Sequence, residues 1–235
     1  MSPHPHSSVI VALDFESASA AMALVDQLGP DARHYKVGLQ LLTEAGPDLA
    51  RGLVAAGKEV FLDLKLHEIP NSVAGAVKAA GRLGASLVTV HASAGSTVLR
   101  AAVAAAQPFP NLRVLALTVI TSLSDQDLPE IGLAPSVQDQ VERLARLSAA
   151  AGCHGVVASV REATCLRHIL PPGSLIVTPG IQLPDSGATD QVRVATPQAA
   201  AMAGASHIIV GRAITAASDP RAAFALAVAG FGRGA

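Results

Sequence analysis

Eight short runs of apolar, strand-forming residues recur along the chain, and their spacing is the first indication of the fold. Valine, isoleucine and leucine dominate these runs with little strict in-and-out alternation, which is typical of strands that are covered on both faces. The expected strands are residues 9–15, 34–38, 59–65, 86–93, 113–120, 155–159, 175–180 and 207–213. This pattern predicts a parallel sheet that is buried on both sides.

Segments with the apolar spacing of helices separate the expected strands, and examples are residues 18–28, 71–83, 96–106, 136–151 and 197–204. Four glycines stand at the junction between an expected helix and the strand that follows it, namely Gly57, Gly84, Gly152 and Gly204. Glycine readily adopts the left-handed conformation that ends a helix. Eight such strand–helix units with right-handed crossovers predict an α/β fold, a (β/α)8 TIM barrel, with a doubly wound sheet as the alternative.

Length and composition agree with one large domain. The chain has 235 residues, close to the roughly 250 that are typical of such a barrel. We expect residues 1–8 to form a disordered tail and residues 9–235 to form the catalytic barrel. Half of the residues are apolar but only 3% are aromatic, so small aliphatic side chains must fill the core.

Charge and cysteine content exclude several functional classes. A net charge of −1 and the absence of tryptophan argue against a nucleic-acid-binding surface, which needs basic and stacking side chains. The chain shows neither a signal peptide nor an apolar run of the roughly 18 residues that a membrane helix requires. Cys153 and Cys165 lack metal-binding spacing. These features predict a cytoplasmic protein with reduced thiols and no membrane partner.

Polar residues stand at or just after the ends of the expected strands, and in a barrel these ends meet at one mouth, where active sites form. They are Asp14, Lys36, Asp63, Lys65, His91, Thr121, Ser122 and Arg212. The two longest loops, residues 121–135 and 181–191, follow strands and so lie on the same face. Asp63 and Lys65 are two residues apart on a strand and should point inward together, with Leu62 and Leu64 facing the helices.

The charged residues at this mouth can be interpreted in two ways. A structural ion pair is the simpler one, but buried pairs are weak stabilisers compared with apolar residues. Lys36 adds a second cation and Glu68 a second anion, so an alternating network that holds reacting groups is the preferred interpretation. At the start of the last helical region, the backbone N–H groups of Gly211 and Arg212 and the Arg212 side chain predict an anion site.

The segment FLDLKLHEIPNSVAGAV, residues 61–77, resembles the signature of the orotidine 5'-monophosphate decarboxylase family. The resemblance extends over nearly the whole chain through the motifs VALDF, YKVG, VHASAG, TVITSL, TPGI with DQVR, and VGRAI. It implies a cofactor-independent carboxy-lyase that converts orotidine 5'-monophosphate to uridine 5'-monophosphate, the last step of pyrimidine nucleotide biosynthesis. It also implies a homodimer with shared active sites and no metal ion.

The resemblance assigns roles to the catalytic residues. Lys65 would protonate C6 of the pyrimidine as carbon dioxide leaves, with Asp63 beside the departing carboxylate. Lys36 would hold Asp63 and a ribose hydroxyl. Glu68 would reach the neighbouring subunit's active site.

The substrate-binding roles follow in the same way. Asp14 would bind the ribose, Ser122 the pyrimidine, and Ser72 would act across the dimer interface together with Glu68. Gln191, Gly211 and Arg212 would take the phosphate, with Gln182 nearby. His91 would shape the pocket rather than act as a base.

Several positions depart from the family's usual pattern. Glu68 stands where aspartate is usual, Gln182 where arginine is usual, Thr189 where glycine is common, and Ser72 where threonine is usual. These departures leave two alternatives open. One is a magnesium-dependent sugar-phosphate lyase or decarboxylase of the same superfamily, with Glu68 as a metal ligand, and the other is a non-catalytic nucleotide-binding barrel.

Overall fold

The computed structural model describes residues 8–184 and 193–233, and in them eight parallel strands close into a barrel in chain order. The strands are β1 (Val9–Ala12), β2 (His34–Gly38), β3 (Glu59–Leu66), β4 (Leu87–His91), β5 (Arg113–Leu117), β6 (Gly155–Val157), β7 (Leu175–Thr178) and β8 (His207–Val210). The last strand pairs with the first, for example Val210 with Val11. This closure confirms the predicted barrel over the doubly wound sheet.

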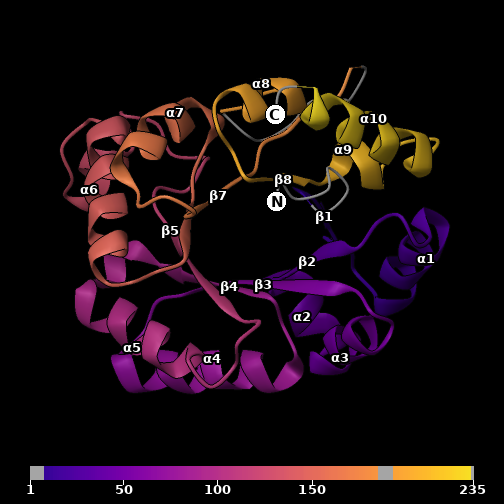
Figure 1. The fold of residues 1–235 in the computed structure, drawn as a ribbon, viewed down its shortest axis with the longest axis horizontal. Coiled ribbons are helices and arrows are strands. Elements are labelled where there is room, and N and C mark those ends of the chain that lie inside the picture. Colours follow the sequence, from indigo (N-terminus) through magenta and orange to yellow (C-terminus); the bar gives the residue numbers. More distant parts are fainter. Residues whose placement is uncertain (1–7, 185–192, 234–235) are drawn as a thin grey trace.

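The helices form a ring outside the strands (Figure 1). They are α1 (Ala18–Leu28), α2 (Leu39–Ala45), α3 (Pro47–Ala55), α4 (Pro70–Leu83), α5 (Ser96–Ala106), α6 (Val137–Ala150), α7 (Val160–Ile169), α8 (Pro197–Met202), α9 (Arg212–Thr215) and α10 (Pro220–Gly232), with the 3-10 helices η2 (Ala92–Ala94) and η3 (Leu128–Ile131). The predicted strands all exist, but six of them end earlier than expected at the carboxyl side. The residues beyond these ends form the loops of the mouth.

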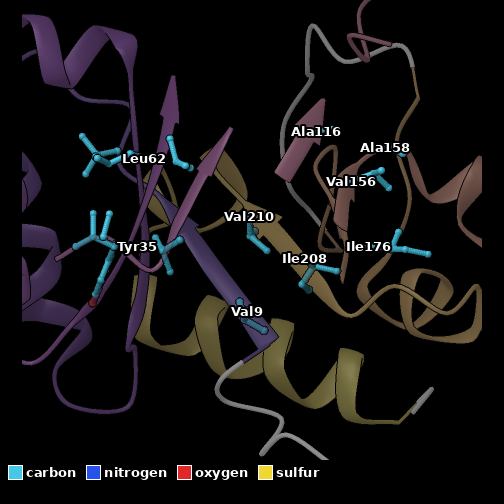
Figure 2. Packing of buried hydrophobic residues seen from close by; sticks show 14 of the residues in the cluster. Val9, Tyr35, Leu62, Ala116, Val156, Ala158, Ile176, Ile208 and Val210 are labelled. Atoms are coloured by element: carbon cyan, nitrogen blue, oxygen red, sulfur yellow. The ribbon is translucent and has the colours of Figure 1, made fainter. Parts of the chain in front are cut away.

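The two sides of each strand build two separate cores. Inward-facing residues such as Ile10, Phe61 and Leu115 fill the barrel itself. Outward-facing residues form a larger core with the helices (Figure 2), and Leu62 belongs to it while Leu64 packs against it. The expectation that Leu62 and Leu64 face the helices is therefore confirmed, and the intervening Asp63 belongs to the interior.

Glycine lies in the turn between helix and strand at all four predicted positions. Gly57, Gly84, Gly152 and Gly204 have φ values of 73°, 85°, 83° and 89°. A side chain would be strained in this left-handed region. The backbone conformation of these repeated turns therefore favours glycine, as the sequence indicated.

Ser8, the last residue of the expected tail, is only 3% exposed and directly precedes β1. Residues 1–7 of the expected tail lie outside the described residues. Cys153 and Cys165 are both free thiols. None of the helices in the described ranges is long and apolar enough to cross a membrane.

Candidate active site

A chain of alternating charges runs across the carboxyl mouth of the barrel, from β1 to β3. Lys36 Nζ donates to Asp14 Oδ1 at 2.9 Å and lies 3.7 Å from Asp63 Oδ2. Lys65 Nζ donates to the same Asp63 oxygen at 2.7 Å. Each carboxylate in this chain is next to at least one ammonium group. The expected contacts among Lys36, Asp63 and Lys65 are present, but the second anion of the network is Asp14, whereas Glu68 was expected in that place.

Thr89 on β4 fixes the orientation of the central carboxylate. Its side chain is completely buried, and its hydroxyl donates to Asp63 Oδ1 at 2.9 Å. The same hydroxyl oxygen accepts a hydrogen bond from the backbone N–H of Lys65 at 2.9 Å. One threonine therefore holds both the Asp63 side chain and the Lys65 backbone, which is the rigid support that a preorganised site requires.

The backbone at Lys65 is unusual. Its φ is 48°, and no other non-glycine residue in the described ranges has a positive φ. The pairing of β3 with β4 is also irregular here, because Leu62 pairs with Val88 while Leu66 pairs with Val90. A left-handed conformation costs a non-glycine residue roughly 1–2 kcal/mol, and such strain gathers at functional sites.

Gly38, at the end of β2, leaves room for the charges. A Cβ atom built at this position would lie 3.0 Å from Lys36 Nζ and 3.3 Å from Asp14 Oδ1. Any side chain here would press on the ion pair. The glycine of the YKVG motif is therefore part of the site, although the sequence identified only the lysine.

His91, at the end of β4, is half-buried and stacks on the exposed ring of His67, with ring centroids 5.2 Å apart. Its Nδ1 lies 2.6 Å from Ser93 Oγ. Burial, and then the nearby charges of His67 and Lys65, lower the pKa of His91 below its usual value. The ring is therefore mainly neutral near pH 7.

Glu68 and Ser72 lie together beyond the end of β3, where Glu68 is exposed. The Ile69 backbone N–H donates to Glu68 Oε1 at 2.9 Å. This bond, together with a hydrogen bond from Ser72, lowers the pKa of Glu68. The carboxylate is thus ionised and open to solvent, outside the chain of contacts that links the other four charged residues.

Ser122 occupies a tight turn after β5. The Leu123 backbone N–H donates to the Ile120 carbonyl at 3.0 Å, which closes a turn with Thr121 and Ser122 at its centre. Thr121 is buried, whereas Ser122 is exposed. The turn therefore leaves the Ser122 side chain accessible.

The residues predicted for the phosphate are only partly described. Gly211 directly precedes the short helix α9 and Arg212 begins it, as expected. Gln182 is held through its backbone N–H, which donates to the Ala195 carbonyl at 2.9 Å. Gln191 lies outside the described residues.

The fold and the site together define the class of protein, which is a (β/α)8-barrel enzyme. A closed (β/α)8 barrel carries paired carboxylates and ammonium groups at the carboxyl ends of its strands, the position at which barrel enzymes perform catalysis. The Lys65 backbone is held by the buried Thr89 and its ammonium group by Asp63, so this lysine has a fixed position at the mouth.

Comparison with known proteins identifies the particular family. The model of the orotidine 5'-phosphate decarboxylase / HUMPS family matches residues 7–227, and the chain belongs to this family. An orotidine 5'-phosphate decarboxylase of Sodalis glossinidius is 47% identical over 223 residues, covering 93% of this chain and 88% of that protein. One of Halorhodospira halophila is 49% identical over 220 residues and covers 92% of each chain.

A solved structure supports the same relationship. The crystal structure of the orotidine 5'-phosphate decarboxylase from Lactobacillus acidophilus aligns with a TM-score of 0.86 at 36% identity. The alignment covers 95% of this chain and 98% of the Lactobacillus chain. Sequence and fold therefore match over almost the full length of these relatives.

Sequence reasoning missed three residues of the site: Thr89, Gly38 and His67. Thr89 left one available signal, since it is a polar residue within an apolar strand and lies two positions before His91, on the same side. The sequence carries no such signal for Gly38 and His67, because their roles depend on which strands are neighbours in space.

Proposed function

We propose that this protein decarboxylates orotidine 5'-monophosphate to uridine 5'-monophosphate without a cofactor. The observation that carries the proposal is the position of Lys65, whose ammonium group is held by Asp63 at 2.7 Å and whose backbone is fixed by Thr89. Relatives that are 44–49% identical bear the name of this enzyme. The proposed role of the protein is the last step of pyrimidine nucleotide synthesis, in the cytoplasm.

The chemistry requires a fixed cation. When the bond between C6 and the carboxylate breaks, its electron pair stays on C6 in an in-plane orbital, which the ring π system cannot stabilise. An ammonium group beside C6 stabilises this charge and then donates a proton to the carbon. Lys65 becomes a neutral amine and regains its proton from solvent, so each turnover consumes one proton and releases carbon dioxide.

Asp63 has two functions in this scheme. It holds the Lys65 ammonium group, and it would lie beside the substrate carboxylate. Because Thr89 and two lysines fix Asp63, it cannot turn away when a second anion arrives. The crowding of two carboxylates favours loss of one as neutral carbon dioxide.

The remaining residues would bind the rest of the nucleotide. Lys36 and Asp14 form an ion pair at the mouth, and both are polar enough to bind ribose hydroxyls. Ser122 would contact the pyrimidine. Arg212, with the backbone of Gly211, would hold the phosphate, and we assign Gln191 and Gln182 to the same side.

A homodimer with shared active sites completes the proposal. Two large apolar side chains lie exposed after neighbouring strands, Leu39 after β2 at 56% and Ile69 after β3 at 62%. Glu68 precedes Ile69 and is ionised in solvent. Exposed apolar side chains together with an ionised carboxylate suit an interface through which Glu68, with Ser72, reaches the partner's active site.

The direct test measures the fall in absorbance as purified protein is mixed with orotidine 5'-monophosphate in the presence of a chelator. The expected result is full turnover with uridine 5'-monophosphate as product, because Asp14 and Asp63 are already neutralised by lysines rather than arranged around a metal ion. Lys65→Ala serves as the matched inactive control.

Two outcomes would contradict the proposal. Activity that disappears with the chelator and returns with magnesium would support the sugar-phosphate enzyme of the same superfamily. Binding of uridine 5'-monophosphate without any turnover of the substrate would support a nucleotide-binding protein that is not an enzyme.

A further inference from the structure

A buried arginine joins the regions that follow two different strands of the barrel. Arg193 lies between β7 and α8, and its Nη1 donates to Glu162 Oε1, near the start of α7, at 2.6 Å. Its Nη2 donates to two backbone carbonyls that follow β5, those of Val119 at 3.2 Å and Ile120 at 3.1 Å. Arg193 therefore joins Glu162 to two carbonyls that lie more than 70 positions before Arg193 in the sequence.

The buried ion pair between Arg193 and Glu162 would be an inefficient way to stabilise the fold alone. Arg193 is 5% exposed and Glu162 is 7% exposed. Within the described ranges, Arg193 Nε and Glu162 Oε2 have no hydrogen-bond partner. Buried ion pairs with unsatisfied atoms stabilise less than apolar residues of similar size, which favours a role in holding a particular geometry.

One of the two carbonyls that Arg193 holds, that of Ile120, belongs to the turn that carries Ser122, and the other, that of Val119, directly precedes this turn. Ile120 is the first residue of this turn, and its carbonyl accepts one hydrogen bond from Leu123 and another from Arg193. The planar guanidinium group can bond to a carboxylate and to two carbonyls at once, which a lysine ammonium cannot do with the same geometry. The position of the turn is thus set by a residue from another part of the chain.

We propose that Arg193, anchored by Glu162, is a positioning residue that holds the turn at residues 120–123 and so presents Ser122 to the pyrimidine. This inference rests on the proposed function, because it takes Ser122 as a substrate contact. Arg193 itself touches no substrate in this scheme. Its effect on the reaction passes through the turn.

A double-mutant cycle on kcat/KM for orotidine 5'-monophosphate tests this role, with Arg193→Met, Ser122→Ala and the combined variant. Misplacement of a substrate contact by about 1 Å can cost on the order of 100-fold, so Arg193→Met is expected to lower kcat/KM by about that factor. In the Ser122→Ala background the same change should cost less than about 3-fold, because the contact that it misplaces is already gone. Equal factors in both backgrounds would overturn the proposal.

Arg193→Lys separates positioning from charge pairing and covers the case in which the methionine variant does not fold. Lysine keeps the ion pair with Glu162 but loses the two-carbonyl contact, so Tm should stay near the wild-type value while kcat/KM remains reduced. Full recovery of kcat/KM in Arg193→Lys would contradict the positioning role. Arg51→Met, which removes an exposed ion pair with Asp48 on α3, is the control and should leave both values unchanged.

Amide hydrogen exchange at Leu123 tests the turn independently of activity. Loss of the Arg193 contact should speed exchange of the Leu123 N–H, which closes the turn. Unchanged protection of this amide in Arg193→Met would refute the proposal even if the protein had a different substrate. Absence of wild-type turnover would instead count against the proposed function alone.

Discussion

Lowering the pH from about 7.5 to about 5 is expected to cost this protein about 2 kcal/mol of folding free energy through one partly buried imidazole, that of His207. His207 begins β8 at the amino end of the barrel. Burial, and then the nearby charges of His34, Arg113 and Arg167, lower its pKa from 6.5 to about 4, against an opposing effect of Glu59.

The sign follows from proton binding in the two states. The unfolded chain takes up a proton on this imidazole below pH 6.5, whereas the folded protein resists it until about pH 4. The stabilisation is therefore complete above pH 6.5 and is lost as the pH falls toward 4. Each pH unit within this window costs at most about 1.4 kcal/mol.

Urea denaturation at the two pH values measures this effect, at one fixed protein concentration because assembly would also change stability. The perturbation is His207→Asn, whose amide can retain the contact of the imidazole Nδ1 with Ser206 Oγ, 3.0 Å away. This variant should lose about 2 kcal/mol less than the wild type between about pH 7.5 and about pH 5. The same substitution at the exposed His168 on α7 controls for the loss of a histidine. Equal pH dependence of the wild type and His207→Asn would refute the reasoning.

Three further outcomes are expected. Lys65→Ala should abolish turnover but keep binding of uridine 5'-monophosphate, measured by calorimetry, and near-normal turnover would remove its assigned role. Mixing inactive Lys65→Ala with inactive Glu68→Ala chains should restore part of the activity in hybrid dimers, and no recovery despite subunit exchange would count against a shared site. Gly155→Ala should destabilise the barrel by more than about 2 kcal/mol in denaturation, because its Cβ would lie 2.2 Å from the Leu175 carbonyl oxygen. Gly52→Ala on the exposed face of α3, where nothing lies within 4 Å of the new Cβ, should be neutral or stabilising, and equal losses in the two variants would contradict this steric argument.

Local patterns predicted most of the fold. The eight strands follow from short aliphatic runs, and the helix ends follow from glycines such as Gly57 and Gly84, because both signals act within a few residues of the chain. The strand ends were placed too late at the carboxyl side, for example at residue 15 where β1 ends at Ala12. The apolar pattern continues beyond this strand, because Leu13 is buried and Phe15 packs against the core although neither belongs to β1.

Only those features of the site that follow from the alternation of side chains along a strand could be predicted from the sequence. Asp63 and Lys65 share a side of β3, as their spacing indicated, but the left-handed backbone of Lys65 and its bond to Thr89 depend on the pairing of β3 with β4. Arg193 was read only as part of a motif, since its partners Glu162 and Ile120 are distant in sequence. Contacts of this kind arise from tertiary structure and leave no local signal.

The pairing of β1 with β8 has a consequence for synthesis on the ribosome. Val9, Ile10 and Val11 emerge first, yet their partners Ile208, Ile209 and Val210 emerge almost last. At about 5–20 residues per second, the first strand waits on the order of 10–40 s with one edge unpaired. An open aliphatic edge is prone to pair with other chains, so the nascent protein should depend on chaperone shielding until its final strand is released.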